Sequence, residues 1–282
     1  MPACAPVVVD ESEDWIVVDK PALMAVHPSK PEDSGTLWDW LRQLLAYECI
    51  TGGQVSLINR LDRETSGLVL VAKTRGTARS LCRQMENHRI QKQYLALVHG
   101  WPSASEWRVD APLLRQGSLG PSAIWLKQAV HPQGAQALTY FQCLQNFERE
   151  IRGVSRRFAL VHARPVTGRM HQIRVHLSQS GHSIVGDKIY GEDETCYLDF
   201  IQTGWTPDLE NRLLLPRHAL HASALTLEES RLSWSCPLPG DLQAFLTRQN
   251  PPASGTAHPQ KSPDSSGLSR SCGTFAAPHS FH

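Results

Sequence analysis

The chain has 282 residues, 41% of them hydrophobic and 20% charged, and its formal net charge is +1. This composition is typical of a globular protein that can bury a sizeable core, and no apolar run is long enough to cross a bilayer. The N-terminal segment lacks a basic region and turns acidic at once, so we expect no secretory signal. Seven cysteines are scattered without a C-x-x-C pair, which argues against disulfides and a cysteine-based zinc site and favours a cytoplasmic location.

The periodicity of apolar residues predicts the elements in chain order. It indicates a strand at 15–21, a helix at 35–48, strands at 55–58 and 67–73, a helix at 77–88, strands at 93–100, 137–145 and 157–165, a helix at 170–181, and strands at 220–227 and 232–236. The strands lack the regular spacing of β-α-β units. The predicted fold class is therefore α+β, with a mixed, largely antiparallel central sheet and flanking helices.

The composition changes near residue 250. Residues 251–282 hold fifteen Pro, Gly and Ser residues in thirty-two positions. Such a segment buries too little apolar surface to offset its loss of conformational entropy. We therefore predict one domain over residues 1–250 and a disordered tail over residues 251–282.

The charges are unevenly distributed. Residues 1–59 carry three basic against nine acidic side chains, residues 60–92 carry eight against three, and residues 151–190 carry seven against one. Two basic blocks on a nearly neutral chain suggest a positive surface that faces a polyanion. Solvated basic faces without a partner would give the same counts, so charge alone does not identify a ligand.

The stretch NRLDRETSGLVLVAK places Asp62 between Arg60 and Arg63, in the loop before the strand at 67–73. A surface ion pair would explain these residues and contribute little to stability. The alternative is a functional carboxylate, and that hypothesis needs further elements.

Two later stretches supply such elements. In QKQYLALVHG, Tyr94 opens an apolar strand with Lys92 two residues earlier on the same side, so its ring could pack in the core or stack on a base. In the helix at 170–181, His171 and Arg174 share one face, and the preceding turn could bind a phosphate at the helix N-terminus. Since His176 does not converge with His171, a zinc site is not expected, and His176 is predicted to make core hydrogen bonds.

Several segments resemble, in order, the motifs of the RluA family of RNA pseudouridine synthases. They are DWIVVDKPALMAVHPS, NRLDRETSGLVLVAK, QKQYLALVHG, RPVTGRMHQIRVHLSQSGHSIVGDKIYG and RHALHASAL. The resemblance covers residues 14–246. One departure is Asn59, where the family usually has histidine; because asparagine also donates and accepts hydrogen bonds, we expect the loop geometry to be retained.

The resemblance implies roles for individual residues. The catalytic aspartate of the family falls on Asp62, its active-site tyrosine on Tyr94, and the basic partner of the aspartate on Arg174. Arg60 is similar to the arginine that helps displace the target nucleotide. The basic blocks would supply further RNA contacts, from Arg60, Arg63, Lys92, Arg164, Arg169 and His171.

The implied activity is the isomerisation of a uridine in transfer or ribosomal RNA to pseudouridine, which needs no cofactor because no redox change occurs, and no metal site is expected. An ionised carboxylate would stabilise the positive charge that develops at C1′ when the glycosidic bond breaks. Few residues precede the first motif, which resembles the compact members that lack an extra RNA-binding module. We expect a monomer with no membrane association.

Two alternatives belong to other classes. One is an inactive RNA-binding protein on the same fold. The other is a hydrolytic glycosidase or nucleosidase, which needs a second carboxylate such as Asp187 or Glu192.

Overall fold

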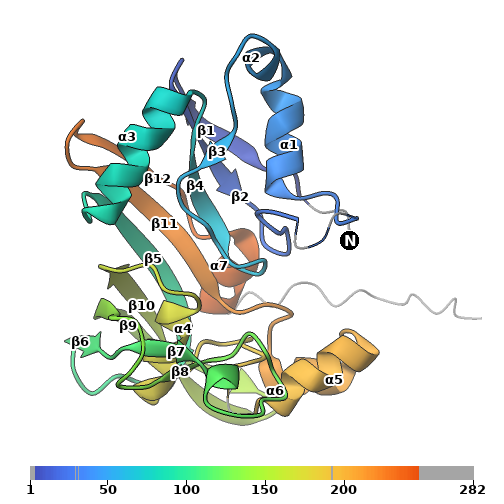
Figure 1. The fold of residues 1–282 in the computed structure, drawn as a ribbon. Helices are drawn as coiled ribbons and strands as arrows, with labels where there is room; N and C mark the ends of the chain where they lie inside the picture. Colours follow the sequence, from blue (N-terminus) through green and yellow to red (C-terminus); the bar gives the residue numbers. More distant parts are fainter. Residues whose placement is uncertain (1–3, 29, 31, 192, 248–282) are drawn as a thin grey trace, which may run out of the picture. The chain divides into compact units, whose positions relative to one another are not determined.

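The computed structural model describes residues 4–28, 30, 32–191 and 193–247. The predicted tail at 251–282 lies outside these residues, as does Glu192, so the tail and the boundary near residue 250 stay predictions. In chain order the elements are β1 (Val7–Glu11), β2 (Trp15–Lys20), α1 (Leu37–Leu44), α2 (Ala46–Ile50), β3 (Ser56–Leu57), β4 (Ser66–Ala72), α3 (Arg75–Glu86), β5 (Ile90–His99), β6 (Glu106–Asp110), β7 (Leu113–Arg115), β8 (Gln128–Val130), β9 (Leu138–Ile151), β10 (Val154–Pro165), α4 (Gln172–Gln179), α5 (Thr195–Thr203), α6 (Pro207–Leu213), β11 (Leu220–Leu227), β12 (Leu232–Ser235) and α7 (Gly240–Thr247) (Figure 1).

One large sheet dominates the described residues. Its main path runs β1-β2-β4-β11-β5-β10-β9-β6, while β12 pairs with β11 and β3 pairs with β4. The β4–β11 pair is parallel and the other pairings of this sheet are antiparallel. The predicted α+β class with a mixed, largely antiparallel central sheet and flanking helices is confirmed.

Alternate residues of β4 face opposite sides of the sheet. Val69 and Val71 belong to the cluster that includes residues of α1, whereas Leu68 and Leu70 belong to the cluster that includes residues of α3. Both clusters consist of buried side chains, so each face of the sheet is covered. A strand buried on both faces has a continuous apolar run, which is why GLVLVA is so uniformly hydrophobic.

The centre of the sheet brings distant segments together. Tyr94 of β5 lies opposite Ala222 of β11 and opposite Ala163 of β10, and Ala222 also pairs with Gly67 of β4. A Cβ atom on Gly67, which has φ +114°, would lie 2.2 Å from the carbonyl oxygen of Ala222. Glycine is therefore required where the Asp62 loop enters β4.

Some elements differ from the predictions. The helix expected at 35–48 is divided at Leu45 into α1 and α2. Strands β9 and β10 extend well beyond the predicted 137–145 and 157–165, because Arg152 and Gly153 both have positive φ and form the tight turn of a long hairpin. In the outer half of this hairpin Phe147 and Ile151 pack against the core, but Arg149 lies between them and is paired with Arg156, which breaks the apolar alternation that predicts a strand. β1, β6–β8 and α5–α7 were not predicted.

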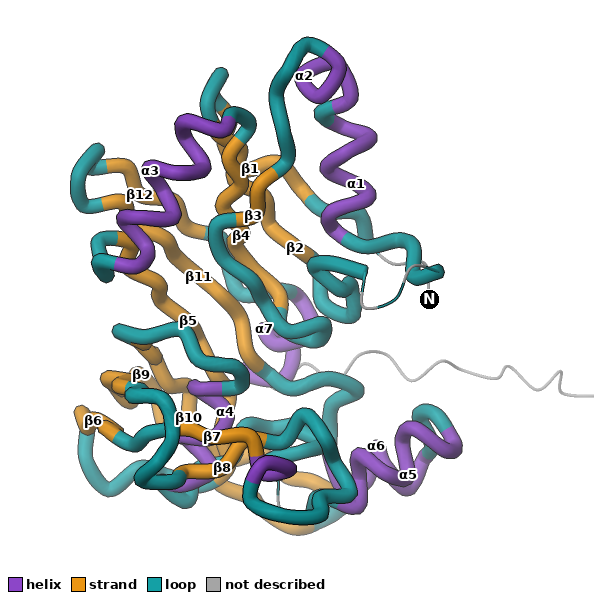
Figure 2. Tube along the Cα trace, in the orientation of Figure 1, coloured by secondary structure: helices purple, strands orange, loops and turns teal. Residues whose placement is uncertain are grey.

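None of the helices in the described part of the chain is both long and apolar enough to cross a membrane. The residues between β3 and β4 and those between β10 and α4 are loops (Figure 2), and they carry most of the candidate site residues.

Candidate active site

A cavity of about 1050 Å³ lies where the loop after β3, the end of α3, strand β5 and the loop before α4 meet. Eight of the nine residues predicted for the site line it: Arg60, Asp62, Arg63, Lys92, Tyr94, Arg169, His171 and Arg174. The ninth, Arg164, instead lines a neighbouring cavity of about 380 Å³, with its guanidinium 6.0 Å from the ring of Tyr140. Lys92 borders both cavities.

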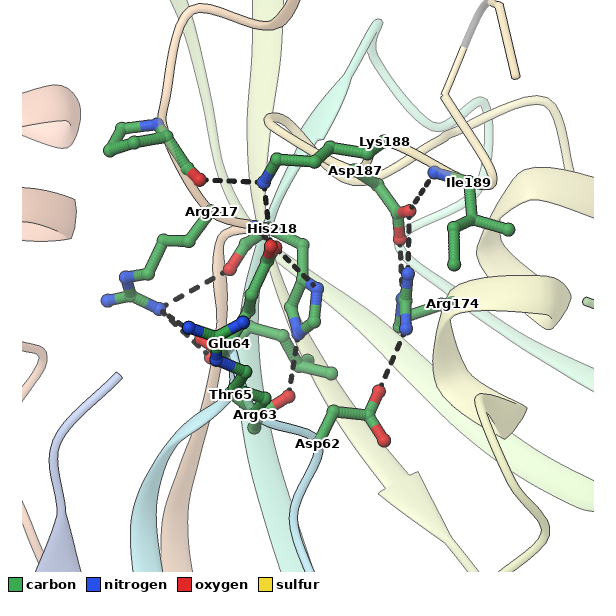
Figure 3. Close-up of polar contacts among 12 residues, drawn as sticks. Asp62, Arg63, Glu64, Thr65, Arg174, Asp187, Lys188, Ile189, Arg217 and His218 are labelled. Atoms are coloured by element: carbon green, nitrogen blue, oxygen red, sulfur yellow. Dashed lines mark hydrogen bonds and ion pairs between the residues drawn. The ribbon is translucent and has the colours of Figure 1, made fainter. Parts of the chain in front are cut away.

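Asp62 makes its ion pair with Arg174, 112 residues away, and not with the arginines beside it in sequence. Arg174 Nη1 donates to Asp62 Oδ2 over 2.9 Å, while Nε and Nη2 donate to the two carboxylate oxygens of Asp187 over 2.6 and 2.8 Å (Figure 3). The side chain of Asp62 is 30% exposed, whereas that of Asp187 is completely buried. One guanidinium thus joins a buried carboxylate to one that faces the cavity.

This arrangement keeps Asp62 ionised. Burial alone raises the pKa of the Asp62 carboxyl, but His171, Arg174 and His218 together outweigh burial and hold that pKa below its ordinary value. The pKa of His171 is itself lowered to about 4, mainly by burial and then by Arg174, so at neutral pH the permanent positive charge beside Asp62 is that of Arg174. Burial raises the pKa of Asp187, but the charge and hydrogen bonds of Arg174, together with His218 and the backbone N–H of Tyr190, outweigh burial and hold this pKa low.

Asn59 fixes the start of the Asp62 loop. Its side-chain Nδ2 donates to the carbonyl of Leu68 over 3.1 Å, and its Oδ1 accepts from the backbone N–H of Leu70 over 2.8 Å. The amide therefore extends the pairing between β3 and β4 by side-chain hydrogen bonds. The residue is 7% exposed, and its side-chain hydrogen bonds are to the backbone of β4.

The other end of the loop is held by Glu64. Its Oε1 accepts from Lys188 Nζ over 2.7 Å, and its Oε2 accepts from the backbone N–H of His218 over 3.1 Å. Thr65 Oγ1 lies 2.7 Å from His218 Nε2, and Arg217 donates to the carbonyl of Glu64 (Figure 3). Burial raises the pKa of Glu64, but His218 and Lys188 outweigh it and lower this pKa to about 2.

A buried lysine also supports the loop. Lys20 Nζ donates to the carbonyls of Pro21 and Met24 over 2.8 and 2.9 Å, and reaches the carbonyl of Arg63 at 3.4 Å. Burial, followed by the charge of Arg217, lowers the pKa of Lys20 to about 7. The carbonyl ligands hold the ammonium group beneath the loop that carries Asp62.

Tyr94 stands on β5 at the cavity wall, 8% exposed. Burial, and then the negative charge of Asp62, raise the pKa of its hydroxyl well above the ordinary value, so the phenol stays protonated. The described residues make no hydrogen bond to this hydroxyl. A protonated phenol and an ionised carboxylate therefore line the same cavity.

The loop before α4 is held by Gln172. Its Oε1 accepts from Thr167 Oγ1 and from the backbone N–H of Arg169, and its Nε2 donates to Leu138 O and Thr139 Oγ1. The next residue toward the N-terminus, His171, has left-handed backbone angles (φ 57°, ψ 15°), which direct its ring to the cavity. Its Nε2 lies 3.9 Å from Asp62 Oδ2.

The predictions for the rest of α4 are confirmed. Ile173 and Leu177 are buried on one face, and Gly181, with φ +80°, follows the C-cap. His176 is fully buried, with Nδ1 2.9 Å from Thr139 Oγ1 and Nε2 3.0 Å from the carbonyl of Ala111. It is a core residue, as predicted.

Sequence reasoning missed the residues that support the site. Lys20, Glu64, Gln172, Lys188 and Tyr190 were given no role, and Asp187 was considered only as a possible second catalytic carboxylate. Asp187 is unsuited to that role, because both its oxygens bind Arg174 and Oδ1 also accepts from the backbone N–H groups of Ile189 and Tyr190. The charged pair within the apolar segment SIVGDKIYG was the available signal, since buried charges need partners.

Solved structures define the class of the fold. The human RNA pseudouridylate synthase domain containing 4 matches with a TM-score of 0.64 and 23% identity, over 86% of this chain and 92% of that chain. The human RNA pseudouridylate synthase domain containing 1 matches with a TM-score of 0.63 and 24% identity, over 88% and 96%. The described fold is the pseudouridine synthase fold.

Sequence comparison defines the family. Residues 14–179 match the family described as RNA pseudouridylate synthase. Ribosomal large subunit pseudouridine synthase D of Nitrosomonas europaea is 34% identical over 257 residues, covering 88% of this chain and 67% of the relative. The protein of the same name in Zymomonas mobilis is 32% identical, over 85% and 71%, and an uncharacterised RNA pseudouridine synthase of Bacillus subtilis is 32% identical, over 84% and 70%. The chain belongs to the RNA pseudouridylate synthase family, and the predicted RluA-type resemblance is confirmed.

Proposed function

We propose that this RNA pseudouridine synthase modifies ribosomal RNA of the large subunit, with Asp62 acting at C1′ of a flipped-out uridine. The observation that carries this proposal is the Asp62–Arg174 pair at the cavity wall, with Nη1 and Oδ2 2.9 Å apart. Arg174 keeps the carboxylate charged, and the 30% exposure of Asp62 leaves it accessible to a nucleotide.

The reaction breaks the bond between C1′ and N1 and forms one between C1′ and C5 of the same base. Positive charge develops at C1′ as the first bond weakens, and a carboxylate beside that carbon stabilises it. Two N–H donors of Arg174 bind Asp187 and a third binds Asp62, so Arg174 holds the Asp62 carboxylate in place throughout. The base leaves with the bonding electrons, turns, and presents C5 to C1′; the proton on C5 is then lost and N1 regains one.

Tyr94 is proposed to hold the detached base and to stand beside the C5 proton. Its ring forms part of the cavity wall, where it can stack on uracil. Because the pKa of its hydroxyl is raised by burial, the phenol enters the reaction protonated. The hydroxyl can thus hydrogen-bond to the base while it turns.

The cationic rim of the cavity is proposed to bind the RNA strand. Arg60, Arg63 and Arg169 are exposed there, and Lys92 lines the wall. Phosphate contacts of this kind position a strand without selecting its sequence. Arg60 stands two residues before Asp62, where it can occupy the stack that the flipped uridine leaves.

The names of the relatives favour ribosomal over transfer RNA as the substrate. The Nitrosomonas europaea and Zymomonas mobilis relatives both carry the name ribosomal large subunit pseudouridine synthase D. We expect this chain to act on the same class of RNA, as a monomer in the cytoplasm.

The test is tritium release from RNA labelled at uridine C5, with ribosomal and transfer RNA purified from a strain that lacks this protein. Release from large-subunit RNA by the wild type, and its loss in Asp62→Asn, is the expected result. Asp110→Asn is the matched control, because Asp110 is exposed at the end of β6 and lies outside the cavity. Release only from transfer RNA would overturn the substrate, and retained RNA binding without any release would favour the inactive RNA-binding alternative.

A further inference from the structure

A chain of hydrogen bonds ends at His171, beside Asp62. The backbone N–H of Gln128 donates to the hydroxyl oxygen of Tyr190 over 2.8 Å, and that oxygen lies 2.8 Å from Nδ1 of His171. Tyr190 is 5% exposed and His171 has a side-chain exposure of 8%, so both groups are largely removed from water. The direction of the second hydrogen bond decides which nitrogen of His171 carries the proton.

The donors and acceptors in this chain leave one consistent arrangement. The N–H of Gln128 can only donate, so the Tyr190 oxygen accepts there. The single phenolic proton must then be donated, and His171 Nδ1 is the acceptor within reach among the described residues. A neutral imidazole that accepts at Nδ1 carries its proton on Nε2.

The two other protonation states are disfavoured by the same contacts. With the proton on Nδ1, the Tyr190 hydroxyl would receive two donors and its own proton would have no acceptor among the described residues. In that state Nε2, then a lone pair, would also face the Asp62 carboxylate 3.9 Å away. A doubly protonated His171 also leaves the phenolic proton of Tyr190 without an acceptor among the described residues. Burial and Arg174 further disfavour this state, because they lower the His171 pKa to about 4.

The Nε2–H group therefore points into the cavity with no hydrogen bond from the described residues, since Asp62 Oδ2 at 3.9 Å is beyond hydrogen-bond distance. We propose that His171 Nε2–H donates a hydrogen bond to an oxygen of the flipped-out uridine beside Asp62, and that Tyr190 is the positioning residue that sets this tautomer. This inference rests on the proposed function, because it assigns a contact to the same nucleotide.

The backbone conformation of His171 indicates that the fold holds its side chain in a specific orientation. His171 has left-handed angles, φ 57° and ψ 15°, which cost on the order of 1 kcal/mol or more for a residue other than glycine. Asp187 and Tyr190 lie in one turn, and they orient Arg174 and His171 respectively. Both groups that face Asp62 thus take their orientation from the segment 187–190.

The tautomer is measured by long-range ¹H–¹⁵N NMR of the uniformly ¹⁵N-labelled full chain, with the His171 resonances assigned by their loss in His171→Gln. The expected wild-type spectrum has a protonated Nε2 and an unprotonated Nδ1. Tyr190→Phe removes the phenolic donor and should convert His171 to a mixture of tautomers. Tyr197→Phe is the matched control, because Tyr197 packs in the same apolar cluster and makes no hydrogen bond through its hydroxyl to the described residues. A wild-type proton on Nδ1, or an unchanged spectrum in Tyr190→Phe, would overturn the assignment.

The role of His171 as a hydrogen-bond donor is tested by replacing it with glutamine or asparagine. The side-chain amides of these two residues place an N–H group at different distances from the backbone. Glutamine can bring its amide near the position of Nε2, whereas asparagine reaches only near Nδ1. Asparagine, however, tolerates left-handed backbone angles better than glutamine. A donor role predicts that His171→Gln keeps kcat within about tenfold of the wild type and that His171→Asn loses at least about tenfold more, the factor that corresponds to one good hydrogen bond. A purely backbone role predicts the reverse order and would overturn the proposal.

The outcomes separate this inference from the proposed function. Wild-type enzyme that releases no tritium would overturn the proposed function and the contact to uridine, while NMR would still decide the tautomer. A wild-type enzyme that releases tritium and has a protonated His171 Nε2, together with a higher kcat for His171→Gln than for His171→Asn, would support both the proposed function and this inference.

Discussion

Asp187 and Lys188 are adjacent in the chain, and each holds a different residue of the loop that carries Asp62. Asp187 binds Arg174, which in turn binds Asp62, whereas Lys188 binds Glu64, two residues beyond Asp62 (Figure 3). Lys188 also donates to the carbonyl of Pro216 over 2.7 Å. A shift of this one turn would therefore move both anchors of Asp62 together.

Asp187→Asn should destabilise the fold and reduce turnover. It leaves the buried Arg174 without its bidentate partner, and removing one member of a buried pair costs about 3–5 kcal/mol. Urea unfolding measures the loss, and tritium release measures the accompanying fall in kcat. Asp199→Asn is the control, because its pair with Arg212 is at the surface and is expected to change stability by less than about 1 kcal/mol. Equal stabilities of the two variants would contradict the assigned role of Asp187.

Glu64 should contribute to the free energy of unfolding, and this contribution should be lost at low pH. Its pKa is about 2 in the folded state against an ordinary 4.5, so its contribution is complete above pH 4.5 and is lost as the pH falls toward 2. At neutral pH we expect Glu64→Gln to lower the free energy of unfolding by about 3 kcal/mol, and the difference from the wild type should shrink between pH 4.5 and 2. Urea titrations across this range measure it. A pH-independent difference, or an equal effect of replacing the exposed Glu229, would refute the prediction.

Asn59→Ala should loosen the Asp62 loop. It leaves the N–H of Leu70 and the carbonyl of Leu68 without their side-chain partner, which costs about 2 kcal/mol for buried groups. We expect kcat to fall while RNA binding is retained. Asn59→His, which introduces the residue usual in the family, should keep more activity than alanine because imidazole can also donate and accept. If alanine is as active and as stable as the wild type, the loop does not depend on Asn59.

Tyr94→Phe should reduce catalysis while leaving the stability of the fold nearly unchanged. Since the described residues make no hydrogen bond to this hydroxyl, its removal should change the free energy of unfolding by no more than about 0.5 kcal/mol. Tritium release should fall by at least about a hundredfold, because a step after glycosidic cleavage loses its phenol. Filter binding of the same RNA should be unchanged. Normal tritium release from this variant would remove the hydroxyl from the mechanism.

Local pattern was enough for much of the fold, whereas the candidate site residues came from the family resemblance. Apolar runs and helical spacing predicted the core strands β2, β4, β5, β10 and β11 and the helices α1, α3 and α4, because those segments bury at least one face and their sequences show the corresponding period. Ordered motifs placed Asp62, Tyr94 and Arg174 in one site, and these three line one cavity. The outer hairpin of β9 and β10 escaped prediction because Arg149 and Arg156 interrupt the apolar alternation of the face that packs on the core.

Only the tertiary structure decided which charged groups meet. Glu64 and Lys188 are 124 residues apart, and Asp62 and Arg174 are 112 apart, so nothing in local spacing links them. Their contacts depend on the parallel pairing of β4 with β11 and on the register of Tyr94 opposite Ala222. The sequence by itself thus determined which segments form most of the core strands and helices and which residues are candidates for the chemistry. Long-range strand pairing decided which carboxylate faces the cavity and which one is buried, because burial and ion-pair distance are properties of the packed chain.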